Sequence, residues 1–350
     1  MKTQIYEDYW KSTLGFTNIY SKNFNKILNL IVNFIDTTKH KEYSEEKYIE
    51  LQKDIYKIYP KNEASIRKVI NTYIKLGFVN SKLKSYHNET PLFLIEKDKT
   101  KKKTIFSKIV YSNASFDRSV KNISSKKEIN FLLKTLNEVK KMSKLDLLAL
   151  MTIDIARFPK GYLNQEELQK AKDHVKATEF GNRKYNQVEH LWLVLKKLDD
   201  LTVDKKYVYL EKDAVSVVSD TKDEERRDHY LQRLYKNQLK EESKELFGII
   251  QCMLEKLDYP SLVASHIKPF RYCLNEEAYD GNNGLLLSQN MDFLFDRGYI
   301  SFKDDGEIML SKNLTDKLRN YLKKFSLDSR LMSDNRKNYL GYHRDKVFIN

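Results

Sequence analysis

Glycine and proline are scarce in this chain, and their scarcity limits its fold more than any other feature. Of 350 residues only 10 are glycine and 5 are proline, so long loops should be few and helices seldom interrupted. Apolar residues recur at helical spacing over most of the chain, and alternating runs are short. The sequence therefore predicts a mainly α-helical, α+β protein with small β-hairpins.

Charge and composition narrow the class of protein. Hydrophobic residues make up 41% of the chain, enough for buried cores, and lysine plus arginine outnumber acidic residues by 63 to 49, a formal net charge of +14. Such an excess attracts polyanions, of which nucleic acid is the commonest. The 23 tyrosines fit a second explanation, a generally lysine- and tyrosine-rich composition, so charge alone does not decide the partner.

The two cysteines, Cys252 and Cys273, are too few for a disulfide framework or for the paired cysteines of a structural zinc site. No apolar run reaches the roughly 18 residues that span a bilayer, and the N-terminus lacks the apolar core of a signal peptide. A GxxxxGK[S/T] phosphate-binding loop is also absent from the sequence. We therefore expect a cytoplasmic protein that uses neither a membrane nor a nucleotide cofactor.

Residues 1–125 form the first expected domain, a helical, winged-helix-like DNA-binding domain. Its amphipathic helices include one over residues 62–79, and residues 91–96 read as a strand. Helices followed by a hairpin are the order of a winged helix, in which Arg67 and Lys68 would lie near the start of the DNA-reading helix. The alternative is an ordinary amphipathic helix before a hairpin.

Residues 126–220 form a second expected domain, helical, for DNA binding or dimerisation. Helical patterns dominate it until residues 206–212, KYVYLEK, alternate as a strand that would close a second small wing. The charged linker at residues 219–226 precedes a third domain, residues 225–350. The residues suited to chemistry lie in this last domain.

The segment between residues 262 and 310 has an order of elements that suggests an active site. LVASHI is a short strand that ends in His266, and after a polar loop Asn283 precedes the apolar run GLLL. A helix follows and carries Asp292 and Asp296 one turn apart on one face. The order strand, loop, strand and helix is that of a ββα-metal site.

A ββα-metal site hydrolyses phosphodiesters with a histidine and one divalent ion. The histidine takes a proton from the attacking water, and the ion stabilises charge on the phosphate and on the leaving oxygen. Oxygen ligands one helical turn apart suit Mg²⁺ or Mn²⁺. The sequence therefore predicts a magnesium- or manganese-dependent site.

The strings SHIKPF, NNGLLLS, QNMDFLFDRGYISF and DDGEIMLS follow one another here in close spacing. Together with the late run YLGYHRDKVF, about 100 residues in all, they closely resemble the HNH endonuclease family, in the branch written SHIxPW…NGLLLSxNLDxLFDRG. The resemblance implies a C-terminal ββα-metal nuclease domain. It makes His266 the general base and Asn283 the residue that orients it.

The resemblance also implies the metal ligands. Asp292 and Asp296 occupy helix positions where family members carry histidine, asparagine or aspartate ligands, and Asn290 competes for the final position of the motif. Ser265 departs from many members, which have an acidic residue or histidine just before the base. With serine there, the ion would depend more on the helix side chains, water and DNA phosphate.

The function implied is that of an HNH endonuclease acting on double-stranded DNA, most simply a type II restriction endonuclease whose front domains read bases in the major groove. Arg271 and Arg297, beside the site, are expected to contact DNA. One site cuts one strand, so a homodimer is expected at least on DNA. The alternatives are a nicking, low-specificity or modification-dependent nuclease, and a winged-helix regulator with an inactive HNH module.

Overall fold

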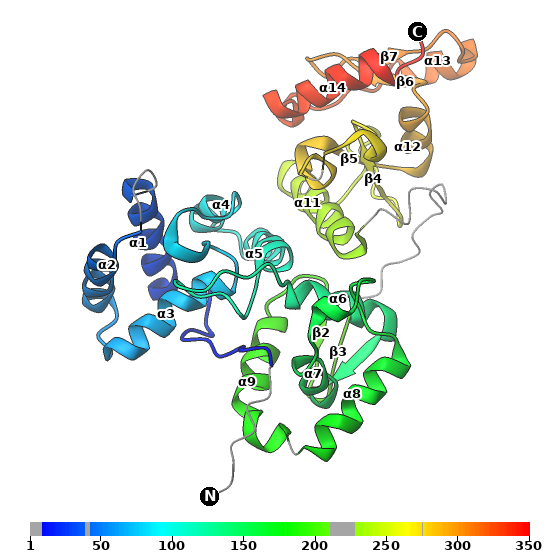
Figure 1. Cartoon of the computed structure of the whole chain (residues 1–350). Helices are drawn as coiled ribbons and strands as arrows, with labels where there is room; N and C mark the ends of the chain where they lie inside the picture. Colours follow the sequence, from blue (N-terminus) through cyan, green and yellow to red (C-terminus); the bar gives the residue numbers. More distant parts are fainter. Residues whose placement is uncertain (1–8, 39–42, 179, 211–227, 275) are drawn as a thin grey trace, which may run out of the picture. The chain divides into compact units, whose positions relative to one another are not determined.

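The computed structural model describes residues 9–38, 43–178, 180–210, 228–274 and 276–350. The chain divides into two compact units, residues 1–211 and 212–350, and each is treated by itself (Figure 1). Within the described residues, no helix combines the length and apolar character needed to cross a membrane.

The first part of unit 1 is helical. Its helices pack around a cluster of aromatic rings, Phe24, Tyr73, Phe78, Phe93 and Phe106, whose neighbouring centroids lie 4.5–6.4 Å apart. The helices are α1 (Lys22–Thr38), α2 (Glu45–Ile58), α3 (Glu63–Lys75), α4 (Thr90–Ile95) and α5 (Lys99–Asn113).

The helix predicted over residues 62–79 is α3. The side chain of Asn62 caps it by accepting a hydrogen bond from the backbone N–H of Ser65, which satisfies one of the free donors of the first turn. Beyond its end, Gly77 takes φ +86°, and a Cβ there would lie 2.6 Å from the carbonyl carbon of Asn113. The turn after α3 therefore needs glycine for both its conformation and its packing.

The strand predicted over residues 91–96 is wrong, because those residues lie in and just after helix α4. Pro91 is tolerated in the first turn of a helix, and the helix buries Phe93 while Leu92 and Ile95 stay exposed. Between α3 and residue 125 the only β pairing of the described residues is an isolated bridge between Val79 and Tyr86. The winged helix expected in residues 1–125 is therefore not confirmed.

The second part of unit 1 combines helices with a small antiparallel sheet of order β1-β3-β2. The expected strand at residues 206–212 is confirmed as β3, which pairs Val208 with Met142 of β1 and with Val203 of β2. Its elements are α6 (Glu128–Val139), β1 (Lys141–Ser143), α7 (Lys144–Met151), α8 (Gln165–Ala177), α9 (Phe180–Leu195), β2 (Leu201–Val203) and β3 (Tyr207–Leu210).

Contacts join the two parts of unit 1. The backbone N–H of Trp10 donates to the carbonyl of Met151 at 2.9 Å, and the Thr104 hydroxyl donates to Asp199 Oδ2 at 2.7 Å. The division into domains at residue 125 stays a prediction, and the linker expected at residues 219–226 lies outside the described residues.

Unit 2 is built around two short hairpins and the helices that cover them. One hydrophobic core runs from Tyr235 through the fully buried Leu285–Leu287 run to Leu340. The elements are α11 (His229–Phe247), β4 (Val263–His266), β5 (Gly284–Leu287), α12 (Gln289–Asp296), β6 (Ile300–Phe302), β7 (Ile308–Leu310), α13 (Asp316–Leu322) and α14 (Asp334–Lys346).

Candidate active site

The hairpin of β4 and β5 carries the predicted catalytic residues. The two strands pair antiparallel, and His266 stands opposite Gly284, directly after Asn283. Helix α12 packs against both strands and is capped by Ser288, whose side chain accepts from the N–H of Met291. The predicted order of strand, loop, strand and helix is confirmed.

The ring of His266 is held on two sides. It stacks on Tyr235 with centroids 4.7 Å apart and meets Phe270 edge-on at 5.7 Å. Its Nε2 lies 2.8 Å from the carbonyl oxygen of Ala278. Because a carbonyl oxygen only accepts, this contact assigns the proton of a neutral ring to Nε2 and leaves the lone pair on Nδ1.

Asn283 is fully buried and ties together the loop that follows His266. Its Oδ1 accepts from the N–H of Lys268 at 2.7 Å, and its Nδ2 donates to the carbonyl of Glu277 at 3.0 Å and to Cys273 Sγ at 3.2 Å. Glu277 immediately precedes the residue whose carbonyl binds the His266 ring. Asn283 therefore fixes the backbone around the histidine through these bonds.

Tyr235 of α11 is a site residue that the sequence did not reveal. It is fully buried, and its hydroxyl lies 2.9 Å from the carbonyl of Asn283, just before β5, and 3.3 Å from that of Ser265 on β4. Burial raises the pKa of this hydroxyl well above its usual value, and the charges of Asp280 and Asp292 add to the rise. Tyr235 is therefore a neutral donor that joins the two strands at the His266 end.

The four predicted metal ligands lie in different environments. Asp292 is half-buried, and its charge contributes to the raised pKa of Tyr235. The ring of His266 stacks on Tyr235. Asp296 is exposed in the last turn of α12, and Asn290 is exposed in its first turn, about 200° around the helix from Asp292. Of the four, Asp292 is the one whose charge acts on the Tyr235 hydroxyl.

Ser265 is 2% exposed, and its Oγ has no hydrogen-bond partner among the described residues. Adjacent residues of a strand point to opposite faces, so this side chain lies on the face of β4 away from His266. Its carbonyl, in contrast, faces the Tyr235 hydroxyl.

The donor set decides which ions fit. In the described part of the chain, no group of three His, Cys, Asp or Glu side chains is close enough to hold a metal by itself. A structural zinc site takes four protein ligands, whereas Mg²⁺ keeps several waters and is held by one or two carboxylates and substrate phosphate. The half-buried Asp292 carboxylate is of the ligand type that such a hydrated ion takes.

Comparison with known families agrees with this geometry. Residues 252–303 match the family model described as HNH endonuclease. This segment is an HNH endonuclease domain. No curated protein matches the chain. The match indicates a nuclease that acts on DNA. It begins after Tyr235, so the residue that stacks on the His266 ring lies outside the matched segment.

Cys252 of the HNH domain packs against the start of α12. Its Sγ accepts from the N–H groups of Glu255 and Ser288 at 3.4 and 3.3 Å, and the Ser288 hydroxyl donates to the Glu255 carboxylate. Burial raises the pKa of this thiol. Both cysteines are free, and Cys252 positions α12 through hydrogen bonds.

A buried ion pair supports the HNH domain from outside the matched segment. Arg336 of α14 is 2% exposed and forms two hydrogen bonds with the carboxylate of Glu242 on α11, at 2.7 and 2.8 Å. It also donates to the carbonyl of Gly281, two residues before Asn283. No local pattern in the sequence could have paired these two residues, which are 94 positions apart.

The four predicted DNA-binding residues are all exposed. Arg271 and Arg297 lie in unit 2, where the guanidinium of Arg271 stands 4.9 Å over the ring of Tyr272. Arg67 and Lys68 lie on α3 in unit 1, and Arg67 forms an ion pair with Glu63 one turn earlier. Exposure leaves each of them accessible to a ligand.

Proposed function

We propose that this chain is a divalent-metal-dependent endonuclease that hydrolyses phosphodiester bonds in double-stranded DNA, most simply a type II restriction endonuclease. The observation that carries the proposal is the hydrogen bond from His266 Nε2 to the Ala278 carbonyl, because it leaves Nδ1 as a base within an HNH domain.

In the proposed reaction His266 Nδ1 removes a proton from a water molecule, whose oxygen attacks the phosphorus as the bond to the leaving 3′ oxygen breaks. The Ala278 carbonyl stabilises the positive ring that results, and the stack on Tyr235 holds the ring plane. A bound Mg²⁺ or Mn²⁺ would supply charge stabilisation at the phosphate. Asp292 is the first candidate to hold it.

The remaining candidate ligands keep secondary roles in the proposal. Asp296 and Asn290 are exposed on α12 and accessible to a hydrated ion, while Ser265 is buried on the other face of its strand. The exposed Arg271 and Arg297 are proposed to contact DNA phosphates near the cut, since guanidinium groups bind phosphate well.

We assign DNA reading to unit 1. In the second part of unit 1, helix α6 and strand β1 come first, and helices α7, α8 and α9 follow. The strands β2 and β3 come last and form a small wing, in which β3 also pairs with β1. That is a winged-helix-like arrangement in residues 126–210 rather than in residues 1–125. Arg67 and Lys68 on α3 are proposed as further contacts. Because one HNH site cuts one strand, a double-strand break requires two copies, and we propose a homodimer on DNA.

Cleavage of unmodified plasmid and phage DNA with Mg²⁺ or Mn²⁺ tests the function. We expect discrete fragments from the wild type, none from His266→Ala, and wild-type fragments from His229→Ala, which removes an exposed histidine at the start of α11. A smear would indicate a low-specificity nuclease, single-strand breaks a nicking enzyme, and cutting of modified DNA alone a modification-dependent one. Binding without cutting of any DNA would leave an inactive regulator.

A further inference from the structure

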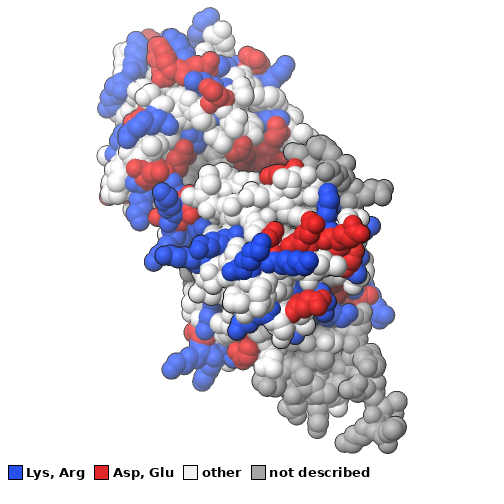
Figure 2. Space-filling model, turned by 90° about the vertical axis from the view of Figure 1, so that its left-hand side faces the viewer, with Lys and Arg blue, Asp and Glu red and all other residues white. Residues whose placement is uncertain are grey.

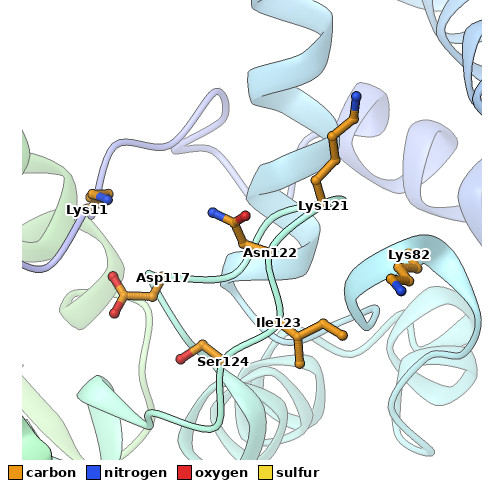
Figure 3. Close-up of a pocket in the computed structure, with 7 residues that line it drawn as sticks. All are labelled: Lys11, Lys82, Asp117, Lys121, Asn122, Ile123 and Ser124. Carbon is orange, nitrogen blue, oxygen red and sulfur yellow. The ribbon is translucent and has the colours of Figure 1, made fainter.

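Unit 1 contains an open hollow of about 500 Å³ beside the loop that joins α5 to α6. Figure 3 shows the residues around it: Lys11 comes from the N-terminal segment, Lys82 from the turn after α3, and the others from the loop itself. The lining residues are Lys11, Lys82, Asp117, Lys121, Asn122, Ile123 and Ser124.

Hydrogen bonds anchor the loop on three sides. The Ser81 hydroxyl donates to the carbonyl of Asn122 at 2.6 Å, and the N–H of Lys82 donates to the carbonyl of Val120 at 2.9 Å. The N–H of Val120 in turn donates to Asn71 Oδ1 on α3 at 3.0 Å. The hollow is therefore formed in advance, and a ligand does not have to order it.

The backbone is strained where it presents one of the lysines. Lys82 and Leu83 have φ values of 60° and 52°, in the left-handed region that residues other than glycine seldom adopt. Leu83 is buried and anchors the turn, while Lys82 stays exposed at the rim. Such strained conformations cluster at binding sites.

The charge of the hollow is positive. Among the described residues, no acidic group lies within ion-pair distance of Lys11 or Lys82. Asp117, the single carboxylate of the lining, pairs with Lys126 at 3.4 Å. Lys121 pairs with Glu45 at 3.2 Å, but both side chains are more than half exposed, and such surface pairs contribute little.

A second hollow of about 310 Å³ shares Lys121 with the first. It adds Arg67 and Asn71 of α3 and Ser119 of the loop, together with the Glu45 carboxylate that pairs with Lys121, so that two cations face one carboxylate in its lining. On the face of the molecule that Figure 2 presents, lysine and arginine side chains are mixed with acidic ones, and no single charge covers that face.

We propose that the paired hollows bind consecutive phosphates of one strand of duplex DNA, with Lys82, Lys121 and Lys11 as the charged contacts. Lysine binds phosphate as a point charge, and the Asn122 amide and Ser124 hydroxyl add neutral donors. Ile123, 74% exposed, offers an apolar contact for a deoxyribose. The proposal rests on the proposed function for its ligand and assigns to unit 1 a backbone contact independent of base sequence.

The test measures binding by the full chain to a short duplex without metal, over a series of salt concentrations. The logarithm of the binding constant falls as the logarithm of the salt concentration rises, and each lost phosphate contact makes this negative slope less steep by about 0.9. We expect that reduction for Lys82→Gln and for Lys121→Gln, about twice as much for the double variant, and weaker binding to every duplex sequence. Lys337→Gln removes the same charge from a lysine of unit 2, on α14, that pairs with Asp334, and it should bind like the wild type.

The outcomes separate this proposal from the nuclease proposal. The His266→Ala variant should bind duplex with the wild-type slope whether or not the wild type cuts DNA. Slopes of Lys82→Gln and Lys121→Gln equal to that of Lys337→Gln, with unchanged thermal unfolding midpoints, would overturn the phosphate site and leave the nuclease proposal untouched. A wild-type chain that binds no duplex would overturn it as well.

Discussion

Replacing Gly284 by alanine tests how tightly Tyr235 controls the catalytic hairpin. Gly284 has φ −144° and ψ 155°, an extended conformation that alanine adopts without strain. A Cβ at this position would, however, overlap the Tyr235 hydroxyl oxygen and lie 2.8 Å from both Tyr235 Cζ and Leu239 Cδ1. All the cost of the substitution therefore comes from steric overlap within a buried site.

We expect Gly284→Ala to lower the free energy of unfolding by about 1–3 kcal/mol, the usual cost of overpacking a core. Displacement of Tyr235 also displaces the ring of His266, which stacks on it, and misplacement of a catalytic group by about 1 Å can cost ~100-fold in rate. Urea unfolding and single-turnover cleavage measure the two effects separately.

A second substitution decides whether Tyr235 is the cause. Tyr235→Phe removes the overlapping oxygen and with it the hydrogen bond from the hydroxyl to the Asn283 carbonyl, which still accepts from the N–H of Ile267; the loss should cost about 1 kcal/mol. The double variant should be more stable than the sum of the two single changes predicts, by about 1 kcal/mol or more. Strict additivity, or a Gly284→Ala protein with wild-type stability and rate, would refute the reasoning.

Three further predictions concern other parts of unit 2. Burial lowers the pKa of His343 to about 4, so between that value and about 6.5 the unfolded chain binds a proton that the folded chain does not. Stability should therefore fall by about 2 kcal/mol from pH 7 to pH 5, and urea unfolding should show a smaller loss for His343→Gln; equal losses would contradict this. Asp292→Asn should raise the Mg²⁺ concentration needed for half-maximal cleavage more than Asp296→Asn does, and the reverse order would exchange their roles. Glu242→Ala leaves Arg336 buried without its carboxylate and should destabilise the fold by about 3 kcal/mol, whereas a loss below 1 kcal/mol in urea unfolding would show that the pair matters little.

The sequence predicted the elements whose pattern is local. The strand before His266, the apolar run after Asn283 and the helix with Asp292 lie within a short stretch, and each has its own periodicity and capping residue. The strand at residues 206–212 was likewise visible in the alternation of KYVYLEK. In these segments the local preference and the tertiary fold agree.

Other features depend on contacts that no local pattern contains. Residues 91–96 form a helix because Phe93 enters an aromatic core contributed by distant helices, and a short apolar run fits either structure. In the sequence, Tyr235 resembles any residue of an amphipathic helix, and Arg336 resembles any charged surface residue. Their roles come from contacts with residues 48 and 94 positions away.

The position of Tyr235 outside the matched segment has a consequence for the transfer of this nuclease between proteins. A graft of residues 252–303 alone would carry the histidine and its hairpin but leave an aromatic-sized gap behind the imidazole, and both strands would lose the donor that joins them. The smallest segment that keeps these contacts when it is transferred extends from α11 to α14. A recombination event or a designed fusion that keeps activity should therefore have its boundaries in the segment before residue 228 and beyond residue 346.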